Sequence, residues 1–93
     1  MGCRLIVDGL SLRDTDLQKL RDEMTGLQEL APYNASILCR LNWNGSDHVG
    51  ILTVKSMAED FVSVCVGGEI RGTVERLFED LRKKLFIWSR SRF

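Results

Sequence analysis

Residues 61–88, FVSVCVGGEIRGTVERLFEDLRKKLFIW, decide the fold of this 93-residue chain. The stretch opens with a short apolar run, stops at Gly67-Gly68, and then carries an apolar residue at every third or fourth position. Spacing of this kind forms one face of an amphipathic helix. The sequence therefore predicts a strand over residues 61–66, a tight glycine turn, and a helix of about five turns from Glu69 onward. Its apolar positions are Ile70, Val74, Leu77, Phe78, Leu81, Leu85 and Trp88.

Two further strands precede this stretch and are predicted to pair as a hairpin. Residues 35–43 alternate between apolar and polar side chains, which is typical of a half-buried strand in an antiparallel sheet. Asn44-Gly45 follows directly, and this pair tolerates the positive φ that a tight hairpin turn requires. We therefore expect the return strand over residues 48–55, followed by a second turn at residues 56–60.

The chain begins with one more strand and one more helix. The strand is expected over residues 3–7, and Asp8-Gly9 ends it. A helix should begin between Ser11 and Asp14, where a Ser or Asp side chain can cap the free amide groups, and it should stop at Pro32. Its apolar stripe consists of Leu17, Leu20, Met24, Leu27 and Ala31.

These elements follow the order β-α-β-β-β-α. Helices with one apolar stripe and strands with one apolar face bury both by stacking in two layers. We therefore expect an α+β two-layer sandwich, in which a four-stranded, mostly antiparallel sheet carries both helices on one face. The length corresponds to a single domain over residues 1–93.

Composition excludes several classes of protein. The hydrophobic fraction of 44% and the charged fraction of 28% exclude a disordered chain, and a net charge of zero excludes a uniformly basic nucleic-acid binder. No apolar run approaches the roughly 20 residues that cross a bilayer, so no membrane partner is expected. The three cysteines, Cys3, Cys39 and Cys65, form no Cys-x-x-Cys motif and are interpreted as core thiols of a cytoplasmic protein.

The sequence shows no set of residues typical of an enzyme or a metal site. His48 is the single histidine, with no cysteine or carboxylate at ligand spacing nearby, and is interpreted as a surface residue beside a turn. Gly67-Gly68 resembles a phosphate-binding turn, but Glu69 follows and would repel an anion. We therefore expect a non-enzymatic protein without a cofactor or a metal.

The charges are unevenly distributed along the chain. Residues 1–74 carry seven basic and ten acidic side chains, whereas residues 75–93 carry six basic and three acidic ones. Arg76, Lys83 and Arg90 recur every seven residues, which places them in one stripe away from the apolar face of the last helix. Cations neutralise phosphates, and the nearby Phe86 and Trp88 can stack on unpaired bases. Cations at a helix C-terminus also offset its dipole, so both interpretations stay open.

The stretch from the last strand into the last helix resembles the ribosome-hibernation factor family, which comprises the short hibernation promoting factors and the ribosome-associated inhibitor A proteins of bacteria. The resemblance covers nearly the whole chain, and the first helix, from Leu10 through Leu27, also resembles the opening segment of the family. Asp80 stands where a cation is common in the family. The matching positions are Gly67, Glu69, Val74, Glu75, Leu77 and Leu81.

The resemblance implies a cytoplasmic, stress-related regulator of translation. Such a protein binds the small ribosomal subunit and its RNA where messenger and transfer RNA would lie, as a monomer or weak homodimer. Basic residues on the helices would contact the RNA. The candidate RNA-binding residues in this chain are Arg71, Arg76, Arg82, Lys83, Lys84, Arg90 and Arg92.

Two other functions are compatible with the same elements. The first is a protein-interaction module without RNA binding, which could form a homodimer through the apolar residues Phe86, Ile87 and Phe93. The second is a double-stranded-RNA-binding domain, which shares the β-β-β-α order. That domain expects a lysine-rich start to its final helix, where this chain has Glu69, Arg71 and Glu75.

Overall fold

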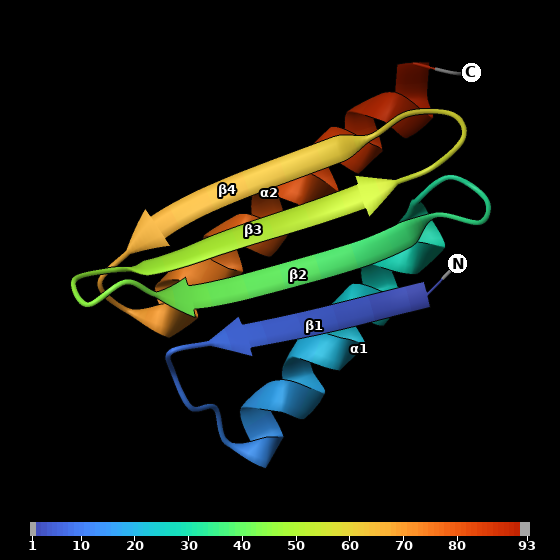
Figure 1. Cartoon of the computed structure of the whole chain (residues 1–93). Helices are drawn as coiled ribbons and strands as arrows, with labels where there is room; N and C mark the ends of the chain where they lie inside the picture. The colour runs from blue at the N-terminus through green and yellow to red at the C-terminus, as the bar shows by residue number, and fades with distance from the viewer. Residues whose placement is uncertain (1, 92–93) are drawn as a thin grey trace.

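The computed structural model describes residues 2–91 and has the predicted β-α-β-β-β-α order (Figure 1). The expected elements are all present, with ends that differ from the predictions by a few residues at most. Their bounds are β1 Gly2–Asp8, α1 Asp14–Leu30, β2 Ser36–Trp43, β3 His48–Lys55, β4 Phe61–Gly67 and α2 Ile70–Ser91.

The four strands form one sheet in the order β1-β2-β3-β4. β1 runs parallel to β2, because α1 carries the chain back between them, and the two remaining pairs are antiparallel. Both helices cover the same face of the sheet (Figure 1), with α1 packed on β1 and β2, and α2 on β3 and β4. The predicted two-layer α+β fold is confirmed, and the opposite face of the sheet is left open.

The core lies between the two layers. The predicted apolar stripes supply it, with Leu77, Leu81 and Leu85 of α2 fully buried. Gly50 of β3 allows α2 to approach closely, since a Cβ atom there would lie 2.9 Å from Cδ2 of Leu77. The other buried apolar side chains are Leu20, Met24, Leu27, Ala35, Ile37, Cys39, Leu41, Leu52, Val54, Phe61 and Phe78.

The start of α1 differs from the expectation. Arg13, with an extended backbone, occupies the N-cap position, and no side chain caps the helix. The prediction of a Ser11 or Asp14 cap was wrong because the helix begins at Asp14 itself, which places that carboxylate inside the first turn. Asp14 and Asp16 there still favour the positive end of the helix dipole.

The burial of one cysteine and of the histidine differs from the expectations. Cys39 is buried as expected, but Cys3 is exposed, because it lies near the start of the edge strand β1. Its thiol contacts Oε1 of Gln28 at 3.3 Å, so the prediction of a core thiol was wrong there. His48 is half-buried rather than on the surface, and its ring centroid lies 4.7 Å from that of Trp43.

Candidate nucleic-acid interface

The outward face of α2 carries three regularly spaced cations, with the carboxylates of Glu75 and Glu79 on the same side. Because Leu77, Leu81 and Leu85 face the sheet, residues on the opposite side of this helix point into solvent. Arg76, Lys83 and Arg90 are all exposed and follow one another at seven-residue intervals, or about 10 Å along the helix axis. We call these three residues the basic ridge.

No carboxylate of residues 2–91 forms an ion pair with the basic ridge. Arg76 donates to two carbonyl oxygens, from Nε to Gly72 at 3.3 Å and from Nη2 to Val66 at 3.5 Å. Lys83 makes neither a hydrogen bond nor an ion pair within this part of the chain. The guanidinium carbon of Arg90 lies 5.6 Å from the ring centroid of Phe86. All three charges are therefore available to an external anion.

Gly67 makes the position of Arg76 possible. A Cβ atom at this glycine would lie 2.6 Å from Nη2 of Arg76 and 2.7 Å from Oγ1 of Thr73. A larger residue at this position would push the Arg76 guanidinium or the Thr73 hydroxyl aside. The glycine turn of the sequence therefore positions the first cation of the ridge.

Two candidate cations are held in pairs with carboxylates. Nη1 of Arg82 lies 2.6 Å from Oε2 of Glu23, which joins α2 to α1. Nζ of Lys84 lies 3.1 Å from Oδ2 of Asp80 and donates to the carbonyl of Val62 at 2.6 Å. These two side chains contribute less free charge than the basic ridge.

Asp80 is itself part of a small polar cluster beside β4. The hydroxyl of Ser63 donates to Oδ2 of Asp80 at 2.8 Å. That hydrogen bond, and then the one from Lys84, lower the pKa of the Asp80 carboxyl below its ordinary value. The carboxylate therefore stays ionised, and Lys84 keeps a partner, well below neutral pH.

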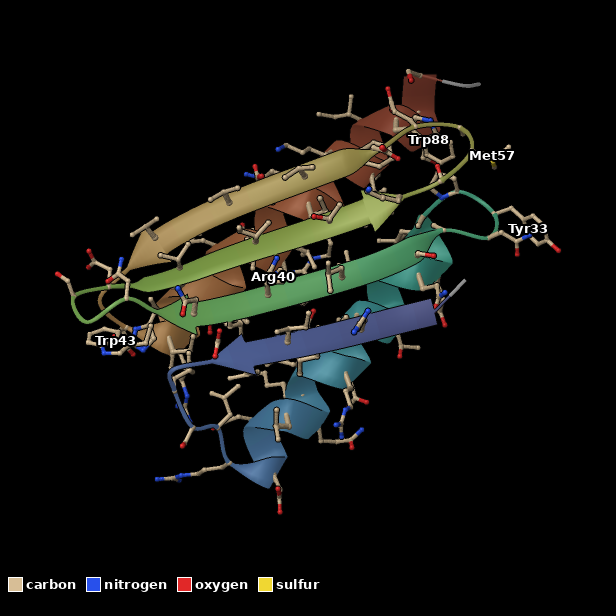
Figure 2. The ribbon with its side chains drawn as sticks, viewed as in Figure 1. Tyr33, Arg40, Trp43, Met57 and Trp88 are labelled. Carbon is tan, nitrogen blue, oxygen red and sulfur yellow. The ribbon has the colours of Figure 1, made fainter. Side chains whose placement is uncertain are left out.

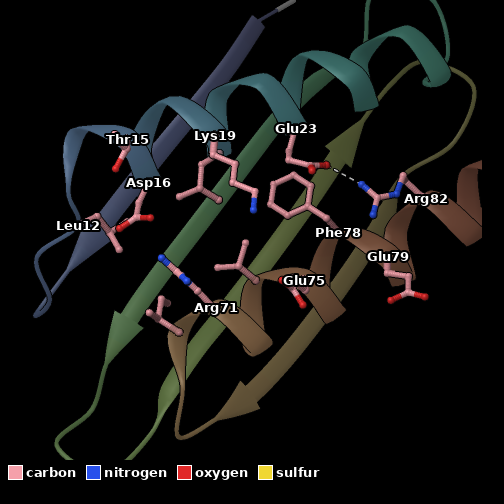
Figure 3. Close-up of a pocket in the computed structure, with 13 residues that line it drawn as sticks. Leu12, Thr15, Asp16, Lys19, Glu23, Arg71, Glu75, Phe78, Glu79 and Arg82 are labelled. Atoms are coloured by element: carbon pink, nitrogen blue, oxygen red, sulfur yellow. Dashed lines mark hydrogen bonds and ion pairs between the residues drawn. The ribbon is translucent and has the colours of Figure 1, made fainter.

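Arg71 lies apart from the ridge, in a groove of about 590 Å³ between the two helices (Figure 3). The groove has an apolar floor that includes Val74 and Phe78. Lys19 of α1 points into it from the opposite side (Figure 3). The acidic residues of the rim are Asp16, Glu23, Glu75 and Glu79. The groove is therefore of mixed charge rather than basic.

The seven candidate RNA-binding residues therefore differ in their surroundings. Three form the basic ridge, Arg71 lines the groove, and Arg82 and Lys84 are paired, whereas Arg92 lies outside the described residues. Phe86 is exposed beside Arg90, but Trp88 is half-buried and packs edge-on against Phe61 with a centroid distance of 6.1 Å. Phe86 is therefore the better placed of these two aromatic residues to stack on a base.

Residues 2–91 lack the features of two other kinds of site. No group of three or more His, Cys, Asp or Glu side chains is arranged to hold a metal ion. Neither helix in this range has the length and apolar character needed to cross a bilayer.

Comparisons with known proteins agree on the fold. No protein-family model matches the chain, and no curated protein matches it by sequence. The N-terminal domain of Thermus thermophilus protein Y is similar in structure, with a TM-score of 0.73 and 12% identity over 88% of this chain and 91% of that one. A ribosomal subunit interface protein from Coxiella burnetii also gives 0.73, with 16% identity over 97% and 99% of the two chains. The resemblance to hibernation factors is therefore confirmed at the level of the fold.

Proposed function

We propose that this chain is a ribosome-associated, RNA-binding protein that inhibits translation by occupying the decoding channel of the small subunit. One observation carries the proposal. A fold shared with a ribosomal subunit interface protein presents three exposed cations, the basic ridge, that form no ion pair with a carboxylate of residues 2–91.

The position of the cations that form no ion pair supports this proposal. The chain has no net charge, so it would not bind a polyanion through its overall field. Neutralising a phosphate requires a cation that is not already paired, and such cations lie in a row on α2. In this proposal α2 faces the RNA, and an unpaired base can stack on the exposed ring of Phe86 beside the cations.

The proposed protein acts by binding rather than by catalysis. Occupying the channel requires a rigid body of the right shape and a set of phosphate contacts, and it requires no reaction. The groove between the helices has a charged rim and an apolar floor, but it holds no histidine or cysteine that could act as a nucleophile with its base. Ribosome binding would place the chain in the cytoplasm.

Charge reversal on the two faces of the molecule tests the proposal. The first variant carries Arg76→Glu, Lys83→Glu and Arg90→Glu on the basic ridge. The matched control carries Arg4→Glu, Arg40→Glu and Lys55→Glu, which lie on the open face of the sheet by their register and change the net charge equally. Figure 2 shows Arg40 on that face. Co-sedimentation with bacterial small subunits measures binding.

We expect the ridge variant to lose at least about tenfold in affinity, while the control keeps most of its binding. Circular dichroism of both variants verifies that each remains folded. Binding that survives reversal of the ridge, or that both variants lose equally, would show that α2 is not the contact surface. An in vitro translation assay then tests whether binding inhibits the ribosome.

A further inference from the structure

The last turns of α2 are apolar on both sides of the helix. Leu85 and Trp88 pack against the core, while Phe86 and Ile87 point the other way with 57% and 67% of their surface exposed. A surface helix normally keeps its outward side polar, and a helix that is apolar all round is normally covered. The exposed side of this segment therefore has the composition of an interface.

The charges on the outward side of α2 change sign along the helix. Glu75 and Glu79 lie in its first half, and neither forms an ion pair with any of residues 2–91. Lys83 and Arg90 lie in its second half, next to Phe86. Arg76 also lies in the first half and is exposed, and its side chain donates to the carbonyl of Val66 in β4.

A helix whose outward carboxylates lie in its first half, and most of whose outward cations lie in its second half, is complementary to a copy of itself in the antiparallel direction. We propose that two copies of this chain associate by crossing their α2 helices antiparallel, with Lys83 and Arg90 of one copy meeting Glu79 and Glu75 of the other. Phe86 of each copy then reaches the other's groove between α1 and α2, whose apolar floor includes Val74 and Phe78.

This arrangement has a two-fold axis, so each contact is made twice and the assembly closes as a dimer. It requires no change in the fold, because all the contacting side chains are already exposed or line the groove. The dimer would cover the basic ridge. Dimer formation and RNA binding would therefore exclude each other. This competition rests on the proposed function, whereas the dimer itself does not.

Sedimentation velocity over about a hundredfold range of protein concentration tests the dimer, without any RNA present. We expect a shift from monomer to dimer as the concentration rises, and a loss of the dimer in Phe86→Ser. Glu79→Lys should weaken association by about tenfold, because it places two cations together across the interface. Lys83→Glu should weaken it by a similar factor, because it places two carboxylates together. Combining Glu79→Lys with Lys83→Glu should restore it, because the pair across the interface is reversed.

The control is Val64→Ser, which removes a comparably exposed apolar side chain from β4 on the open face of the sheet. It should leave association unchanged. A protein that stays monomeric at every concentration overturns the proposal. So does a dimer that Val64→Ser disrupts and Phe86→Ser does not, because the contact would then be the open sheet. Failure of the dimer leaves ribosome co-sedimentation unaffected, so the two proposals are separable.

Discussion

Individual thiols differ sharply in their surroundings, and this difference is open to a direct test. Burial raises the pKa of the Cys39 thiol from 9.0 to about 12, whereas Cys3 is exposed. Because the thiolate is the nucleophile, Cys39 in the folded protein should resist alkylation until the pH approaches 12. With iodoacetamide at pH 8, mass spectrometry should find Cys3 modified first, and Cys39 only after denaturant is added. Equal rates in the native protein would contradict the buried position.

The sequence predicted the burial of single residues correctly where a repeated spacing of apolar residues indicated it. It failed for features that depend on one position alone. Alternation and helical spacing identified the buried positions, because many residues contribute to each pattern. The expected cap at Ser11 or Asp14 depended on the exact first residue of one helix, and the exposure of Cys3 depended on which strand lay at the edge. A local pattern contains neither of these facts.

Two adjacent lysines on α2 provide a test at the level of the element. Lys84 is tied to Asp80 and to the carbonyl of Val62, whereas Lys83 forms no hydrogen bond or ion pair within residues 2–91. Lys84→Gln should lower the free energy of unfolding by about 0.5–1 kcal/mol. Lys83→Gln should stay within about 0.5 kcal/mol of the wild type but weaken ribosome binding more. Denaturant titrations and co-sedimentation measure both effects, and the reverse order would contradict this assignment.

The ion pair between the helices gives a second prediction. Glu23→Gln removes the acid that holds Arg82, and because both side chains are well exposed, the loss of stability should be below about 1 kcal/mol. Release of Arg82 should raise the affinity for the small subunit by about threefold. The control is Asp22→Asn on the same helix, which changes the net charge equally but releases no cation. An equal gain in affinity for both variants would mean that the net charge of the protein, and not the release of Arg82, strengthens binding.

Helix periodicity predicted the basic ridge but not the partners of the other cations. The seven-residue repeat places Arg76, Lys83 and Arg90 on one side of any helix. The bond between Arg82 and Glu23 spans 59 positions, and the contact of Lys84 with Val62 spans 22. Such contacts depend on how two elements pack, so the candidate cations could not be told apart from the sequence alone.

At the scale of the whole molecule, the fold was predictable and its charge distribution only partly so. Element order and one apolar face per element lead to two layers, and the same layers occur in proteins with 12% and 16% identity. Many apolar sequences can fill one core, so such low identity is compatible with a shared fold. The side of the molecule on which the free charge lies depends on which cations are paired.

The salt dependence of binding to the small ribosomal subunit tests the central claim most directly. Four of the candidate RNA-binding residues, the basic ridge and Arg71, form no ion pair within residues 2–91. They predict a slope of about −3 when the logarithm of the binding constant is plotted against that of the salt concentration. Neutralising the ridge with Arg76→Gln, Lys83→Gln and Arg90→Gln should reduce this slope to about −1. An unchanged slope in that variant, or binding by the wild type that does not depend on salt, would contradict the account.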